Sequence, residues 1–317
     1  MTASQGRLDR AARTAIEQCL ALSADESCAI VTDPSRIDIA EALYRAAHAV
    51  SGSAVLVRYP EGDTHGSEPP SPVAGSLERS DAFLAPTAKS LSHTRARQRA
   101  CAAGARGATL PGITESVFVT GLDADYDRIE TQCDDLQRQL VGVSTVRVET
   151  ERGTDVTFDV EGRDWLSDTG IVHDPGSFSN LPAGEVFISP ASANGTVIVD
   201  GTMRPHGLLE TPIELTFADG KLTDITDPDI RETVERAAES VGEAAYNVAE
   251  LGIGANDGVE ELVGSVLLDE KAAGTIHVAI GDDASIGGDT EAPIHLDGIV
   301  RDPVVRADGT VVELPGS

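Results

Sequence analysis

The alternation of strand-like and helical segments through the first 140 residues constrains the fold more than any other feature of this chain. Four apolar runs have the length of buried strands and lie at 28–33, 53–60, 81–86 and 108–113. Helical periodicity marks the segments 37–50 and 90–104, whereas the proline- and serine-rich segment 61–75 is typical of an exposed loop. Strands that alternate with helices form parallel sheets with helices on both faces. The first part of the chain is therefore predicted to be an α/β domain with a parallel sheet.

The pattern changes near residue 141. Residues 144–165 are predicted to form two alternating strands around a glycine turn, and strand-like sequence continues to the end of the chain. A single helix, predicted over 229–245, interrupts this β-rich part. A length of 317 residues suits one large or two ordinary domains, and the change of pattern favours two. We therefore expect an N-terminal α/β domain over 1–141 and a β-rich α+β domain over 142–317.

Charge restricts the partners of the protein. The chain has 53 acidic and 24 basic residues, which gives a formal net charge of −29. Nucleic acid is a poor partner, because phosphate binding needs clustered lysine and arginine. The acidic residues repel one another at low ionic strength, whereas molar salt shortens the screening length to about 3 Å. We expect a halophilic protein adapted to a salt-rich cytoplasm, and an ordinary acidic protein is the alternative.

Two further sequence features bear on location. No apolar run approaches the ~18 residues that a membrane span needs, and the start MTASQGRLDR lacks the apolar stretch of a signal peptide. The four cysteines show no CxxC spacing, which favours reduced thiols over a disulfide framework or a zinc ribbon. The expected location is the cytoplasm, without a membrane partner.

Four predicted strands of the second half share one pattern. They lie at 184–190, 247–254, 274–281 and 293–300. In each, aliphatic residues alternate with positions that carry a carboxylate or an imidazole beside glycine or alanine, so one face suits packing and the other suits ligands. These side chains suit one or two divalent ions such as Zn, Mn, Co or Fe, and they are Glu185, Glu250, His277, His295 and Asp297. Spacing alone does not show that the strands converge, so a structural role for each residue stays open.

The same segments carry a resemblance to a known family. NLPAGEVFISP (180–190), NVAELGIG (247–254), LLDEKAAGTIHVAIG (267–281) and IHLDG (294–298) resemble the metal-binding motifs of the aminopeptidase T family of metallopeptidases. The resemblance extends from about residue 80 to the end of the chain. It implies a two-domain homodimer with two divalent ions (Zn, Co or Mn) held by the five side chains named above. It also implies a water, activated by both ions, that hydrolyses the N-terminal residue from a small peptide substrate.

The aminopeptidase interpretation suggests a further role for Glu250 and roles for two more positions. Glu250 and Glu270 are the candidate catalytic carboxylates, although a surface ion pair with Lys271 is an equal alternative for Glu270. His93, in the matching segment 90–113, is a candidate to bind substrate, and an interdomain or dimer contact is its alternative. The chain departs from the family at Ala284, where the family tends to have tyrosine.

Two other functions stay open. Relatives that resemble 2,5-dihydroxypyridine dioxygenase use a single non-haem Fe(II), for which His277, His295 and Asp297 would supply two imidazoles and one carboxylate. The presence of both Glu185 and Glu250 favours a second metal and so the aminopeptidase. The loss of the family tyrosine also allows a metal-binding protein without turnover.

Overall fold

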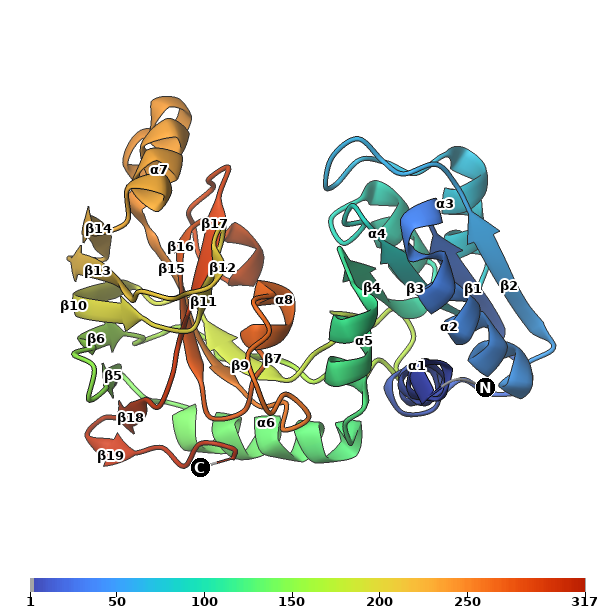
Figure 1. Ribbon diagram of the computed structural model, residues 1–317, viewed down its shortest axis with the longest axis horizontal. Helices are drawn as coiled ribbons and strands as arrows, with labels where there is room; N and C mark the ends of the chain where they lie inside the picture. The colour runs from blue at the N-terminus through green and yellow to red at the C-terminus, as the bar shows by residue number, and fades with distance from the viewer. Residues whose placement is uncertain (1–2, 317) are drawn as a thin grey trace. The chain divides into compact units, whose positions relative to one another are not determined.

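The computed structural model describes residues 3–316 and divides them into two compact units (Figure 1). The first unit contains the chain up to Glu130 together with Asp168–Ala183, and the second contains Thr131–Ser167 together with the chain from Gly184 onward. The division therefore first falls between 130 and 131, and the chain returns once to the first unit. The sequence pattern predicts one boundary near residue 141 and does not predict that the chain returns to the first unit.

The first unit is built on a five-stranded parallel sheet in the order β2-β1-β3-β4-β8. Its strands are β1 (Ser27–Thr32), β2 (Ser53–Arg58), β3 (Ala82–Thr87), β4 (Arg106–Pro111) and β8 (Phe178–Asn180). The parallel α/β architecture predicted for this part of the chain is confirmed. The short strand β8 comes from the returning segment and pairs with Gly107–Thr109 of β4.

Helices alternate with these strands along the chain. They are α1 (Ala3–Arg13), which continues as the π-helical η1 (Thr14–Cys19), η2 (Pro34–Arg36), α2 (Ile37–Val50), α3 (Ser71–Glu78), α4 (Arg95–Ala102), α5 (Glu115–Leu122) and α6 (Tyr126–Leu140). Side-chain oxygens of Thr94 and Thr114 accept hydrogen bonds from the backbone at the first turns of α4 and α5. The loop predicted over 61–75 is wrong at its end, because α3 begins at Ser71. Pro72 lies in the first turn of this helix, where proline costs no hydrogen bond.

The second unit contains two seven-stranded sheets, built largely from antiparallel pairs. The first has the order β14-β13-β10-β6-β5-β18-β19 and the second β12-β11-β17-β16-β15-β9-β7. This result confirms a β-rich part after the α/β part. The strands of the first sheet are β5 (Thr145–Glu149), β6 (Asp155–Asp159), β10 (Ser192–Val199), β13 (Ile213–Ala218), β14 (Lys221–Ile225), β18 (Val304–Ala307) and β19 (Thr310–Val311).

The second sheet of this unit has one aliphatic face and one polar face. Its strands are β7 (Leu166–Asp168), β9 (Glu185–Ile188), β11 (Thr202–Met203), β12 (Gly207–Leu208), β15 (Val248–Gly254), β16 (Ile276–Gly281) and β17 (His295–Val300). A Cβ added at Gly298 of β17 would lie 2.7 Å from Cγ2 of Val199 in β10, so the two sheets touch there. The aliphatic face that includes Gly298 therefore packs on the other sheet, and the opposite face is left for polar side chains.

Besides most of α6, which passes from the first unit into the second at Thr131, the second unit contains two α-helices and two 3-10 turns among its described residues. They are α7 (Pro228–Val241), η3 (Gly242–Tyr246), α8 (Val266–Asp269) and η4 (Ala284–Ile286). Asp227 caps α7 by accepting hydrogen bonds from the backbone of Asp229 and Ile230. Together α7 and η3 correspond to the single helix predicted over 229–245. Among residues 3–316, no helix is both long and apolar enough to cross a membrane.

Candidate metal centre

Four adjacent strands bring the predicted ligands onto one face of a sheet. In the register of β9, β15, β16 and β17, Gly254 pairs with Glu185, Gly252 with His277, and Ala279 with both Glu250 and Asp297. Antiparallel partners directly opposite each other point to the same side of the sheet. The carboxylates and imidazoles therefore lie on one face, separated by small residues.

A β-bulge in β15 lies directly before Glu250. Val248 pairs with Ile280, whereas Glu250 pairs with Ala279, so β15 has one extra residue at Ala249. Strict alternation would put Glu250 on the same side as Val248. The bulge shifts the alternation by one residue, so Val248 points to the aliphatic face. Glu250 keeps regular alternation with Gly252, the partner of His277, and therefore lies on the polar face.

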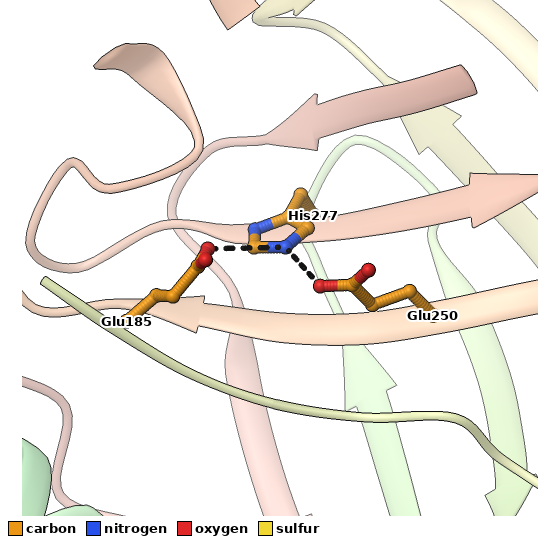
Figure 2. A group of neighbouring side chains, drawn as sticks. All are labelled: Glu185, Glu250 and His277. Carbon is orange, nitrogen blue, oxygen red and sulfur yellow. Dashed lines mark hydrogen bonds and ion pairs between the residues drawn. The ribbon is translucent and has the colours of Figure 1, made fainter. Parts of the chain in front are cut away.

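Figure 2 shows the first of two ligand groups, in which His277 lies between the carboxylates of Glu185 and Glu250. Nε2 of His277 is 3.1 Å from Oε1 of Glu250 and 3.5 Å from Oε2 of Glu185. The side chains are almost fully buried, with exposed fractions of 1% for His277 and 8% for each glutamate. Ligand atoms of all three residues lie within 4.8 Å of one another.

Glycine in β15 makes room for this imidazole. A Cβ added at Gly252 would lie 2.1 Å from both Cε1 and Nε2 of His277. No side chain fits at that distance, so the His277 ring lies directly over the backbone of Gly252. This requirement explains why residue 252 is glycine.

The second ligand group contains Glu250, His295 and Asp297 and shares Glu250 with the first. Nε2 of His295 is 3.2 Å from Oε2 of Glu250 and 3.2 Å from Oδ1 of Asp297. Nδ1 of His295 lies 2.7 Å from the backbone oxygen of Asp282. Because that oxygen can only accept, Nδ1 carries a proton and Nε2 faces the carboxylates, as in many histidines that bind metals.

Burial and mutual contacts shift the pKa values of these groups strongly. Burial acts to raise the pKa of Glu250, but hydrogen bonds from His277 and His295 outweigh it and lower this pKa to about 2. Burial acts to lower the pKa of His277, but Glu250 and Glu185 outweigh it and raise this pKa to about 9. The pKa of His295 is also raised well above its usual value, against the effect of burial, by Asp297 and Glu250. The carboxylates thus hold positive charge on both rings.

These residues fit a divalent cation. Oε2 of Glu185 and Nδ1 of His277 are buried and have no hydrogen-bond partner among the described residues. Buried polar atoms without partners are rare in proteins, and an ion is one explanation for them. A cation would also supply the positive charge that protons on the two imidazoles otherwise provide. Imidazole and carboxylate together suit Zn, Mn, Co or Fe better than Ca or Mg.

Glu270 and Lys271 lie at the Glu185 end of the site. Oε1 of Glu270 is 2.8 Å from Nζ of Lys271, which also contacts Oε1 of Glu185. The expected pair between Glu270 and Lys271 is present, but it is buried rather than on the surface, because the Lys271 side chain is only 5% exposed. Sequence reasoning missed Lys271 as part of the site. Its rarity was a possible signal, since the chain has only Lys89, Lys221 and Lys271.

The remaining predicted positions lie elsewhere. His93 is exposed and precedes the cap residue of α4 in the first unit. Its role in binding substrate stays a prediction. Ala284, which stands where the aminopeptidase T family tends to have tyrosine, is exposed at the start of η4, after β16.

Comparison with known proteins gives a family match and two similar structures. The model of the family described as NicX: 2,5-dihydroxypyridine 5,6-dioxygenase matches residues 7–317. The structure of 2,5-dihydroxypyridine dioxygenase from Pseudomonas putida KT2440 is similar with a TM-score of 0.79 at 18% identity, over 100% of this chain and 98% of that one. Wild-type AmpT from Thermus thermophilus is similar with a TM-score of 0.67 at 18% identity, over 98% of this chain and 97% of that one. No curated protein matches the chain. At such low identity, both structures show a shared fold.

Proposed function

This chain belongs to the 2,5-dihydroxypyridine 5,6-dioxygenase family, and on that premise we propose that it is a ring-cleaving dioxygenase that uses one non-haem iron ion. The proposed substrate is a dihydroxylated aromatic ring of the kind named in the family description. The observation that carries the proposal is a family match across nearly the whole chain. Two imidazoles and a carboxylate on one sheet face support it.

The expected aminopeptidase activity is wrong as the main function. The family that matches is a dioxygenase family, and the dioxygenase structure is more similar to this chain than the aminopeptidase structure is. The chain is therefore an enzyme of a dioxygenase family rather than a hydrolase. The error has a physical cause, because the same five side chains can hold either one ion or two. Local motifs do not distinguish these cases.

Three residues are proposed to hold the iron. They are His277, from the first ligand group, and His295 and Asp297, from the second, which share one sheet face and would form the two-histidine, one-carboxylate arrangement of non-haem Fe(II) oxygenases. Bound ferrous iron would supply the dioxygen chemistry that no amino-acid side chain provides. Ligation needs neutral imidazoles, so binding of the ion would release the protons that the carboxylates now hold on the rings.

The surrounding residues keep the proposed ligands in place. The backbone oxygen of Asp282 fixes the tautomer of His295, so that Nε2 is the ring nitrogen that faces Glu250 and Asp297. The Glu250 carboxylate lies between the two rings, 3.1 Å from Nε2 of His277 and 3.2 Å from Nε2 of His295. Burial of Glu250 and His277 excludes bulk water from this side of the site.

Oxygen consumption tests the proposed function. We expect protein loaded anaerobically with Fe(II) to consume oxygen when 2,5-dihydroxypyridine is added, and zinc-loaded protein to consume none. Asp297→Asn should lower the iron content and abolish consumption, because an amide is a weaker ligand than a carboxylate. Asp289→Asn is the matched control, since Asp289 is exposed with a side chain 96% accessible. An iron-loaded protein that consumes no oxygen with any dihydroxylated pyridine or benzene would contradict the proposal.

The expectations of a cytoplasmic homodimer that does not bind nucleic acid or membranes stay predictions. Of the partners expected from sequence, only a small-molecule substrate enters the proposal, as an aromatic ring in place of a peptide.

A further inference from the structure

The polar face of the sheet has enough ligands for more than one ion. Two groups of candidate ligands share Glu250, one extending towards Glu185 and His277 and the other towards His295 and Asp297. In two-metal sites the ions lie about 3.5–4 Å apart and commonly share a carboxylate. The arrangement of side chains therefore raises the question of what limits such a site to a single ion.

We propose that the ammonium group of Lys271 takes the place of a second metal ion at the Glu185 end, and so restricts the centre to one divalent ion. The inference rests on the proposed function, for which it identifies the residue that determines metal stoichiometry. Nζ of Lys271 contacts Oε1 of Glu185 and lies 2.8 Å from Oε1 of Glu270, so its positive charge is already paired with both carboxyl groups at this end.

Lys271 is held rigidly in this position. Its backbone N–H donates to the oxygen of Leu268, and its own oxygen accepts from the backbone of Asn256 at 2.7 Å. Asp269, two residues before Lys271, is fully buried and accepts hydrogen bonds from Thr202 and Gly264. These contacts fix the backbone on both sides of the lysine. The ion pairs with Glu185 and Glu270 then hold the buried ammonium group at this end of the site.

Repulsion between the ammonium group of Lys271 and a metal ion excludes a second ion from this end of the site. Two cations a few ångströms apart repel strongly where water is excluded, and Lys271 and Glu185 have side chains only 5% and 8% exposed. A divalent ion bound by Glu185 would have to displace the ammonium group from its carboxylate. The ion pairs of Lys271 lie with Glu185 and Glu270, whereas Nε2 of His295 faces Glu250 and Asp297 in the other group, which we propose to bind the ion.

Metal stoichiometry tests this inference directly. Metal-free protein is titrated with Mn²⁺, by calorimetry and by elemental analysis after gel filtration, so that the result does not depend on activity. We expect about one ion per chain in the wild type and about two in Lys271→Met, because the freed carboxylates of Glu185 and Glu270 then need a cation. Lys221→Met removes the same charge from a lysine outside the site and should leave one ion.

A double variant guards against misfolding of Lys271→Met. Glu185→Gln/Lys271→Met removes both partners of the ion pair, so it avoids a buried unpaired charge at Glu185. It should bind one ion with a dissociation constant within about threefold of the wild type, since Glu185 is not a ligand of that ion. Two ions in the wild type, one ion in folded Lys271→Met, or no ion in the double variant would each overturn the inference.

The outcomes also separate this inference from the proposed function. A wild type that binds one ion but consumes no oxygen would refute the dioxygenase and leave the role of Lys271 intact. Conversely, oxygen consumption by a protein that binds two ions would refute the role of Lys271 alone.

Discussion

At the scale of single residues, the metal centre depends on a position without a side chain. The ring of His277 lies where a Cβ of residue 252 would stand, 2.1 Å from Nε2. Glycine at this position therefore determines how close the imidazole lies to Glu250.

Replacement of this glycine should damage both stability and metal binding. We predict that Gly252→Ala lowers the free energy of unfolding by about 1–3 kcal/mol, as overpacking does in other buried sites. Displacement of His277 should also weaken Mn²⁺ binding by at least about tenfold. Gly75→Ala is the control, because no atom lies within 4 Å of its added Cβ and alanine favours the helix α3. Urea unfolding and metal titration measure the two effects, and equal behaviour of both variants would contradict the prediction.

At the scale of secondary-structure elements, an ion pair joins the segment before β1 to the start of β4. Nη1 and Nη2 of Arg106 bond to Oε1 and Oε2 of Glu26 at 2.5 and 2.8 Å, and Arg106 also donates to the backbone oxygen of Leu20. The Arg106 side chain is 8% exposed, so it needs these partners. The hydrogen bonds from Arg106 lower the pKa of Glu26 from 4.5 to about 2.

The stabilisation from this pair should depend on pH. The folded pKa of Glu26 lies below its unfolded value, so its contribution is present above pH 4.5 and is lost as the pH falls towards 2. We predict that Glu26→Gln lowers the free energy of unfolding by about 2 kcal/mol at pH 7, a value that allows for the partial exposure of the pair. The difference from the wild type should shrink at pH 3.

A second ion pair in the same unit provides the control. Glu78 contacts Arg99, whose side chain is 54% exposed, and Glu78→Gln should therefore cost less than about 1 kcal/mol at either pH. Urea unfolding of dilute protein gives these values. A cost of Glu26→Gln that does not depend on pH would disprove the link to its ionisation.

At the scale of the whole molecule, the dominant feature is the negative net charge. A formal net charge of −29 over 317 residues produces self-repulsion that has to be screened. We propose that the protein is adapted to high salt. The screening length falls from about 30 Å at 0.01 M to about 3 Å at 1 M, and the repulsion falls with it.

The midpoint of thermal unfolding should therefore rise with KCl concentration. We expect an increase of several degrees between about 0.01 and 1 M, since about 1 kcal/mol shifts the midpoint of a domain of ordinary size by 2–8 °C. Sucrose at matched osmolality is the control, because it stabilises by exclusion without screening charge. A midpoint that responds equally to both solutes, or to neither, would reject the adaptation.

The sequence by itself determined the properties that depend on neighbours along the chain. Apolar periodicity predicted the helix at 37–50 with the bounds of α2, and alternation predicted four strands close to β9, β15, β16 and β17. It also identified the side chains on their polar face. Local patterns carry this information because helix and strand periods are properties of short segments.

Only the tertiary structure decided how these segments meet. The register of β15 with β16, the bulge at Ala249, the addition of β8 to the first sheet and the burial of Lys271 all depend on residues distant in sequence. The LLDEK motif therefore suggested a surface ion pair at Lys271, whereas the fold placed this lysine among the carboxylates. Pairing between distant strands is set by the packing of whole sheet faces, and a local sequence motif does not predict it.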